Sequence, residues 1–195
     1  MIIGITGGTG CGKTTLLDAI ESCGGLVLDC DAIYHQLLQS DKEMLTAIAT
    51  RFPGTVEDGQ LQRKKLGAIV FADEAALADL NRITHSAVKN EVLRRLASQP
   101  KLAAIDAIGL IEGELAELCD VTVAVTAPLE DRVKRIMARD GISEEYARNR
   151  IAAQHCNDWF REKCTYTLEN NGSFDAFATK CLAFLSTLDI MKENL

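Results

Sequence analysis

The residues with the clearest chemical meaning form a glycine-rich segment near the start of the chain. Residues 7–15 read Gly-Gly-Thr-Gly-Cys-Gly-Lys-Thr-Thr and match the pattern G-x-x-x-x-G-K-S/T. Glycines let successive backbone N–H groups turn toward phosphate oxygens, and a helix that follows adds its positive N-terminal end. The pattern predicts a site for the phosphates of a nucleoside triphosphate, with Gly8, Gly10, Cys11 and Gly12 in its wall.

Three side chains at the end of this segment have distinct expected roles. Lys13 is a mobile cation for the β and γ phosphates, and the Thr14 hydroxyl is a hard oxygen ligand suited to Mg²⁺. Thr15 is placed to hold the α phosphate. The motif lies between an apolar strand at Ile2–Thr6 and a helical pattern at Leu16–Ile20, which is the context it requires. We expect Cys11 to be a small filler within the loop.

A second group of candidate residues is the acidic pair Asp29-Cys30-Asp31. A carboxylate at the carboxyl end of a strand beside a phosphate loop can accept a proton from an acceptor hydroxyl or orient Mg²⁺. The alternative is that one or both aspartates cap a helix that begins at Ala32. The general-base role is favoured for Asp31, and the two roles are balanced for Asp29.

The elements that position these residues follow from the pattern of apolar segments. Strand-length runs occur at Ile2–Thr6, Leu26–Leu28, Leu102–Ile105, Val121–Thr126 and Tyr166–Leu168, with helical spacing between them. This alternation predicts an α/β fold with a five-stranded, mostly parallel sheet flanked by helices. Residues 1–30, 102–128 and 165–195 would form the nucleotide-binding core.

Two long connections in this fold are predicted to be helical additions. Residues 31–101 are far longer than a simple crossover requires, so we expect a helical subdomain that binds the acceptor. Residues 129–164 carry six arginines and break at Asp140-Gly141. Such a segment is typical of a closing lid that neutralises a phosphoryl group in transfer.

Composition limits the classes of partner. The 195 residues carry a formal charge of −7, which disfavours a protein that coats nucleic acid. We expect no nucleic-acid and no membrane partner, since no apolar run approaches the length of a membrane span. Seven scattered cysteines without a C-x-x-C pair indicate reduced thiols in the cytoplasm. Oligomeric state is not predicted.

The class of phosphate-loop protein is narrowed by motifs that are missing. The sequence lacks the N-K-x-D motif of switch GTPases, and the D-x-x-G match at residues 106–109 is weak when it stands alone. The 195 residues also leave no room for large motor modules. The class of phosphate-loop protein that remains is a small kinase.

At this point the sequence resembles the dephospho-coenzyme A kinases over nearly its whole length. The resemblance rests on the phosphate loop, the Asp29-Cys30-Asp31 pair, residues 62–71, residues 80–85, residues 135–143, residues 150–154 and Asn170. It implies the phosphate-loop nucleoside triphosphate hydrolase fold, with ATP, Mg²⁺ and dephospho-CoA as ligands. The implied activity is phosphorylation of the ribose 3′-hydroxyl of dephospho-CoA, the last step of coenzyme A biosynthesis.

The resemblance also implies roles for single residues. Asp31 would be the general base, and Lys13 with Arg139 would stabilise charge on the moving phosphoryl group. Thr14 would be the Mg²⁺ ligand, and Asn170 would lie near the adenine of ATP. Asp29, Asp31, His85 and Glu112 would contact the acceptor.

Several positions depart from the family pattern. Ile108 and Gly109 stand where the family has Pro-Leu ahead of Glu112, Ser86 replaces a proline, and Thr165 replaces an aspartate. These departures bear on the choice of acceptor. A kinase of another small acceptor, such as a nucleoside monophosphate, and a non-catalytic nucleotide-binding regulator are therefore the alternatives.

Overall fold

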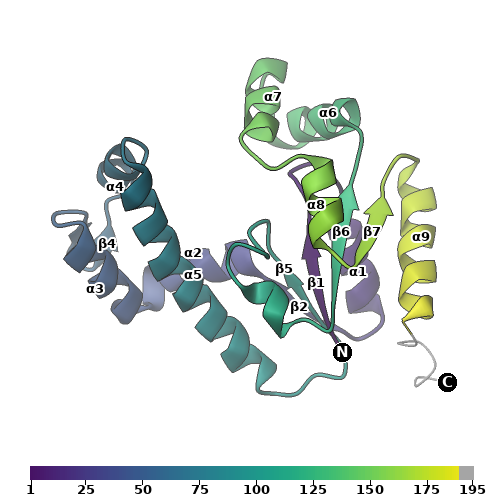
Figure 1. Cartoon of the computed structure of the whole chain (residues 1–195), viewed down its shortest axis with the longest axis horizontal. Coiled ribbons are helices and arrows are strands. Elements are labelled where there is room, and N and C mark those ends of the chain that lie inside the picture. The colour runs from purple at the N-terminus through teal and green to yellow at the C-terminus, as the bar shows by residue number, and fades with distance from the viewer. Residues whose placement is uncertain (189–195) are drawn as a thin grey trace. The chain divides into compact units, whose positions relative to one another are not determined.

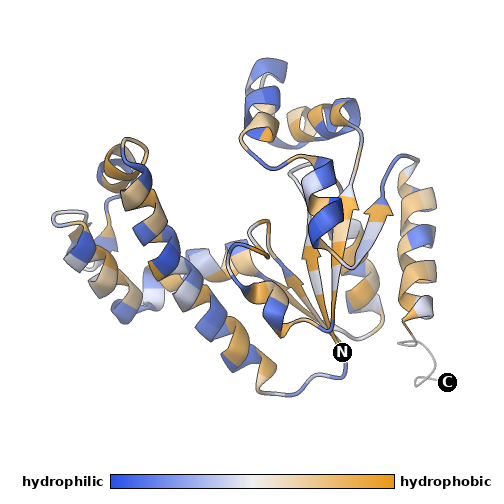
Figure 2. Ribbon diagram, in the orientation of Figure 1, coloured by the Kyte–Doolittle hydropathy of each residue, from blue (hydrophilic) through white to orange (hydrophobic). Residues whose placement is uncertain are grey.

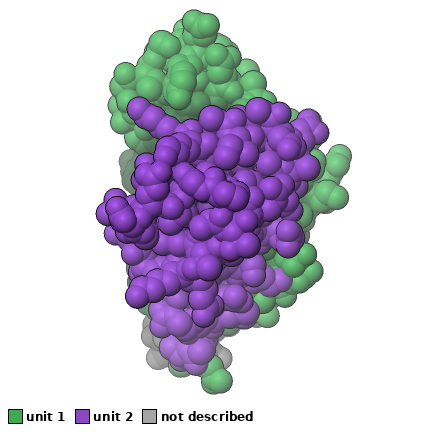
Figure 3. Space-filling view, turned by 90° about the vertical axis from the view of Figure 1, so that its left-hand side faces the viewer, with its two compact units in different colours: residues 1–28, 99–195 green, residues 29–98 purple. Residues whose placement is uncertain are grey.

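The computed structural model describes residues 1–188 and divides into two compact units (Figure 1, Figure 3). Unit 1 contains residues 1–28 and 99–195, and unit 2 contains residues 29–98. The predicted acceptor-binding segment was residues 31–101, and the predicted lid, residues 129–164, lies within unit 1. The predicted core segment 165–195 extends beyond residue 188, and that last part lies outside the described residues.

Unit 1 is built on a five-stranded sheet with the order β2-β5-β1-β6-β7. The strands are β1 (Ile2–Thr6), β2 (Leu26–Asp29), β5 (Ala103–Asp106), β6 (Val121–Thr126) and β7 (Tyr166–Glu169). The pairs β1–β5, β1–β6 and β6–β7 are parallel. All five strands occur where the apolar runs predicted them, which confirms the α/β fold with its phosphate loop after the central strand.

Helices cover both faces of this sheet, so its strands are apolar almost throughout (Figure 2). Helix α1 (Lys13–Ser22) packs beside α9 (Phe174–Thr187), and the last strand leads directly toward α9. Their shared core with the sheet includes Ile5, Ile20, Val123 and Cys181, all buried. A 3₁₀ helix, η1 (Leu115–Leu118), lies between β5 and β6.

Three helices separate β6 from β7, in the segment where the sequence predicted a helical addition. They are α6 (Leu129–Asp140), α7 (Glu144–Ala152) and α8 (Asn157–Lys163). Gly141 ends α6 in the left-handed conformation, at the break that the sequence indicated, and the Ser143 hydroxyl accepts from the Tyr146 amide to cap α7. Helices α6 and α7 lie beyond the carboxyl ends of the strands (Figure 1).

Unit 2 is mainly helical, as expected. Its helices are α2 (Cys30–Ser40), α3 (Lys42–Arg51), α4 (Arg63–Val70) and α5 (Glu74–Leu96). A short hairpin, β3 (Val56–Glu57) and β4 (Gln60–Leu61), was not predicted because its strands have only two residues each. Its turn residues Asp58 and Gly59 both have positive φ, which suits a tight hairpin turn. Within residues 1–188 no helix combines the length and apolar character needed to cross a membrane.

Candidate functional site

The phosphate loop turns sharply between β1 and α1. Gly7, Gly10 and Gly12 have φ values of 140°, 79° and 96°, which L side chains rarely adopt. A Cβ at Gly7 would also clash with the backbone carbonyl of Val125, and one at Gly10 would press on the backbone of α6. These glycines therefore give the loop both its curvature and its close packing against neighbouring backbone.

Lys13 is the first residue of α1, so its side chain leaves the loop at the positive end of the helix. Its Nζ lies 3.4 Å from the Gly7 carbonyl oxygen and 3.7 Å from Asp106 Oδ1. Both ion-pair partners are largely shielded from solvent, with side chains 19% and 17% exposed. Thr14 follows on the exposed side of the helix, and the Thr15 amide donates to the Gly12 carbonyl.

Asp106 was missed as a site residue by the sequence reasoning. It is the last residue of β5, the strand adjacent to β1, so its carboxylate comes to the same edge of the sheet as Lys13. The available signal was the D-x-x-G match at residues 106–109, whose aspartate is this residue. The match indicates a carboxylate beside the phosphate loop, although not a GTPase.

Asn170 and Arg135 hold the half of the loop nearest α1. Asn170, 5% exposed and directly after β7, donates from Nδ2 to the Cys11 carbonyl at 2.9 Å. Arg135 donates to the Gly10 carbonyl at 3.3 Å and to Asn170 Oδ1 at 3.3 Å. A side chain at Gly12 would clash with Asn170. The structure thus places Asn170 against the phosphate loop itself.

Arg132 and Gln154 hold the other half of the loop. Arg132 Nε donates to the Thr9 carbonyl at 2.9 Å, and the Thr9 amide donates to Gln154 Oε1 at the same distance. Arg132 Nη2 also donates to Gln154 Oε1, at 3.3 Å. Sequence reasoning counted Arg132 only among six candidate lid arginines, because its spacing does not distinguish it from the others.

Arg139, the predicted partner of Lys13 in charge stabilisation, is bound to its neighbour in this structure. Its guanidinium makes two hydrogen bonds to Asp140, at 2.6 and 3.0 Å, and 59% of its side chain is exposed. Arg150 donates to the same carboxylate at 2.6 Å. These arginines hold the pKa of Asp140 down at about 2. Among the arginines of residues 129–164, Arg132 and Arg135 contact the phosphate loop in this structure, and Arg139 binds Asp140 instead.

Cys11 is buried inside the loop, and only 1% of the residue is exposed to solvent. Burial raises the pKa of this thiol above its usual value, so the reactive thiolate is disfavoured. The residue fills space between the loop and the sheet, in agreement with the predicted filler role.

Glu112 lies in unit 1, in the connection between β5 and η1. Its Oε1 is 2.9 Å from His155 Nε2, and the His155 ring stacks on Trp159 at 3.8 Å between centroids. Glu112 and His155 line a cavity of about 370 Å³ together with Gln154, whose side chain accepts a hydrogen bond from the Thr9 amide. Ile108 and Gly109, where the chain departs from the family pattern, line this cavity too.

The remaining predicted acceptor residues lie in unit 2. Asp29 caps α2, since its Oδ1 accepts from the Ala32 amide at 3.0 Å, and the helix begins at Cys30. Asp31 is exposed in the first turn of α2, and His85 is half-buried in α5. The capping role considered for Asp29 is therefore present in the structure, and the Asp31 side chain is exposed.

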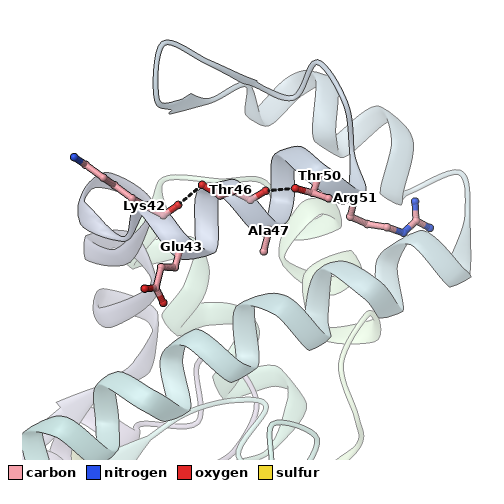
Figure 4. Close-up of a pocket in the computed structure, with 6 residues that line it drawn as sticks. All are labelled: Lys42, Glu43, Thr46, Ala47, Thr50 and Arg51. Atoms are coloured by element: carbon pink, nitrogen blue, oxygen red, sulfur yellow. Dashed lines mark hydrogen bonds between the residues drawn. The ribbon is translucent and has the colours of Figure 1, made fainter.

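A broad depression on α3 is also part of unit 2 (Figure 4). The Thr46 and Thr50 hydroxyls donate to carbonyls of the same helix, and Arg51 pairs with Asp79. These polar groups are used within the unit, so we assign the depression no binding role. It measures about 680 Å³ and is lined by Lys42, Glu43, Thr46, Ala47, Thr50 and Arg51.

A five-stranded parallel sheet with a phosphate loop after its central strand, Lys13 beside Asp106, and arginine-bearing helices at the same edge define a phosphate-loop kinase. The family model for dephospho-CoA kinase matches residues 1–176. The chain therefore belongs to the dephospho-CoA kinase family.

Individual relatives agree with this assignment. A dephospho-CoA kinase of Corynebacterium diphtheriae is 35% identical over 180 residues, covering 89% of this chain and 90% of the relative. The crystal structure of TT1252 from Thermus thermophilus is similar with a TM-score of 0.80 and 34% identity, covering 96% and 97% of the two chains. The dephospho-CoA kinase structure from Campylobacter jejuni gives a TM-score of 0.68 and 26% identity, covering 100% and 98%.

Proposed function

We propose that this protein transfers the γ-phosphoryl group of ATP to the ribose 3′-hydroxyl of dephospho-CoA, which yields ADP and coenzyme A. The observation that carries the proposal is the phosphate loop with Lys13 3.7 Å from Asp106, in a chain matched over residues 1–176 by the dephospho-CoA kinase family. Phosphoryl transfer depends on positioning and charge stabilisation, and this loop supplies both for the donor nucleotide.

The proposed chemistry assigns one step to each group. Asp31 accepts the proton of the ribose 3′-hydroxyl while the 3′-oxygen of the ribose forms a bond to the γ-phosphorus. The bond between that phosphorus and the bridging oxygen of ADP breaks at the same time. Lys13 and the loop amides stabilise the charge that develops on the phosphoryl oxygens. The exposure of Asp31 supports this role, because an exposed carboxylate is accessible to a substrate.

Mg²⁺ is part of the proposal, and the donor set fits it. The Thr14 hydroxyl and the Asp106 carboxylate are hard oxygen ligands on neighbouring elements. Within residues 1–188 no cluster of three or more His, Cys, Asp or Glu side chains could hold a metal alone. A site with few protein ligands is sufficient for Mg²⁺, because the ion keeps several water ligands and also binds the phosphates of the substrate. When bound, the ion would neutralise phosphate charge.

The other site assignments are part of the same proposal. Residues 31–101 would bind the acceptor through Asp29, Asp31 and His85, and residues 129–164 would act as the lid. Glu112 would contact the acceptor from the wall of the 370 Å³ cavity. Arg139 would reach the phosphoryl group only after it exchanges its bonds to Asp140 for bonds to phosphate.

We further propose that the protein works in the cytoplasm on small-molecule substrates alone, without a nucleic-acid partner. Within residues 1–188 the cysteines at residues 11, 23, 30, 119, 156, 164 and 181 form no disulfide, which supports a reducing compartment.

The test is a coupled ADP-release assay with MgATP in the presence and absence of dephospho-CoA, with CoA identified by mass spectrometry. We expect ADP release that depends on dephospho-CoA. A panel of nucleoside monophosphates in the same assay is the comparison. Faster turnover with a nucleoside monophosphate, or ATP binding without transfer to any acceptor, would overturn the proposal.

A further inference from the structure

Arg132 differs from the other charged residues of the predicted lid in its burial. The residue is 3% exposed, and burial lowers the pKa of its guanidinium. Its hydrogen-bond acceptors are the Thr9 carbonyl and the Gln154 amide oxygen, both neutral. Among the described residues, no carboxylate pairs with it. A buried cation without a counter-ion is costly, and an anion at this position would compensate it.

The other arginines of residues 129–164 differ from Arg132 in their exposure and in their hydrogen-bond partners. Arg139, Arg148, Arg150 and Arg161 each bind at least one carboxylate and are each 39% exposed or more. Their charges are already compensated on the surface. Arg135 is held by two loop carbonyls and Asn170, at the half of the loop that leads into α1.

The place of Arg132 along the loop indicates which phosphate it would meet. Its Nη2 lies so close to Gly8 that a Cβ there would clash with it. The Lys13 ammonium bonds to the neighbouring residue, Gly7. Because the lysine of such loops serves the β and γ phosphates, the Gly7–Thr9 segment marks the terminal-phosphate end. Arg135 contacts residues 10 and 11 and therefore lies farther toward the α phosphate.

We propose that Arg132 is a further substrate-binding residue, whose charge binds the terminal phosphate of the nucleoside triphosphate while Thr9 and Gln154 fix its guanidinium. This inference rests on the proposed function only in that the loop binds a nucleoside triphosphate. The identity of the acceptor does not enter it.

The test compares the affinity of full-length variants for ADP and for the non-hydrolysable β,γ-imido analogue of ATP, by calorimetry with Mg²⁺. The variants are Arg132→Gln, whose amide can still donate to Thr9, and the matched Arg135→Gln from the same helix. We expect Arg132→Gln to lower the preference for triphosphate over diphosphate by about 10- to 100-fold, as loss of a charged hydrogen bond does. Arg135→Gln should weaken both nucleotides by a similar factor.

Equal weakening of both nucleotides by Arg132→Gln would overturn the inference and leave Arg132 as a structural brace. Arg132→Lys is the second variant, and it should restore part of the triphosphate preference because it restores the charge. A thermal melt of each variant identifies loss of folding. Because no acceptor is present, these outcomes are separate from the proposed function, which is tested by the acceptor assay on the wild type.

Discussion

The Lys13 ammonium lies 3.7 Å from the Asp106 carboxylate, although 93 positions separate the two residues in the sequence. The parallel pairing of β1 with β5 produces this relationship, because it brings the carboxyl ends of both strands to one edge of the sheet. The phosphate loop follows one strand and Asp106 ends the other. The lysine is thus held in place before a nucleotide binds.

Asp106→Asn should lower the turnover number by about 10²-fold and raise the Mg²⁺ concentration needed for half-maximal rate, because it removes the carboxylate beside Lys13. Steady-state ADP release over a Mg²⁺ series measures both effects. Asp120→Asn is the matched control, since Asp120 accepts a hydrogen bond from the Ile2 amide at the opposite end of β1. A similar loss in both variants would assign Asp106 a structural role.

Asp31→Asn should lower the rate of CoA formation by about 10²- to 10⁴-fold and leave ATP affinity nearly unchanged, because the amide cannot accept the hydroxyl proton. Turnover and ATP titration report the two quantities. Asp41→Asn is the control, because Asp41 caps α3 in the same unit through the Met44 amide and asparagine caps equally well. Unchanged turnover in Asp31→Asn would contradict the general-base assignment.

The variants Arg139→Gln and Arg150→Gln distinguish a catalytic role of Arg139 from a purely structural one, because both arginines bind the carboxylate of Asp140. Both arginines bind Asp140, at 2.6 Å each. If Arg139 moves to the phosphoryl group, its variant should lose at least about 10-fold in turnover, while Arg150→Gln stays near the wild type. Single-turnover measurement of phosphoryl transfer checks this. Equal effects in the two variants would mean that Arg139 only stabilises the end of α6.

Gly7→Ala should destabilise the fold much more than Gly141→Ala. Both residues have positive φ, which costs an alanine about 1 kcal/mol, but only Gly7 faces a backbone carbonyl that cannot move. We expect about 1 kcal/mol for Gly141→Ala, whose Cβ enters open space, and at least about 3 kcal/mol for Gly7→Ala. Urea unfolding followed by circular dichroism measures the difference. Equal losses would refute the packing argument.

Glu91→Gln should reduce the loss of stability in acid. Hydrogen bonds from Arg94 and Arg95 hold the pKa of Glu91 at about 2. Because this pKa is below its unfolded value of about 4.3, the stabilisation is present above pH 4.3 and is lost as pH falls toward 2. The variant should therefore be less stable than wild type at pH 7 and show a flatter decline from pH 5 to 2. Glu21→Gln, at an exposed residue of α1, is the matched control for the change of charge.

The sheet could be predicted from sequence because its three inner strands, β1, β5 and β6, are largely buried on both faces and therefore have nearly continuous apolar runs. The phosphate loop could be predicted because its backbone requires glycine at positions with positive φ, and the spacing of these glycines in the sequence is fixed. The β3–β4 hairpin could not, since two-residue strands leave no period to detect. Arg132 and Gln154 were not assigned because their proximity to the loop comes from tertiary packing, and nothing in their local sequence records it. Asp106 was not assigned because its only local signal was the weak D-x-x-G match at residues 106–109.

The hydrogen bond from Asn170 to the Cys11 carbonyl has a consequence for how the protein is made. The two residues are 159 positions apart, so the loop leaves the ribosome well before the residue that supports it has been synthesised. Its strand β1 also waits for β5 and β6, which flank it on either side. A nascent chain that stops before residue 170 carries the whole glycine motif and lacks the buried amide that holds it. The phosphate loop therefore gains its full support only after the growing chain has passed residue 170.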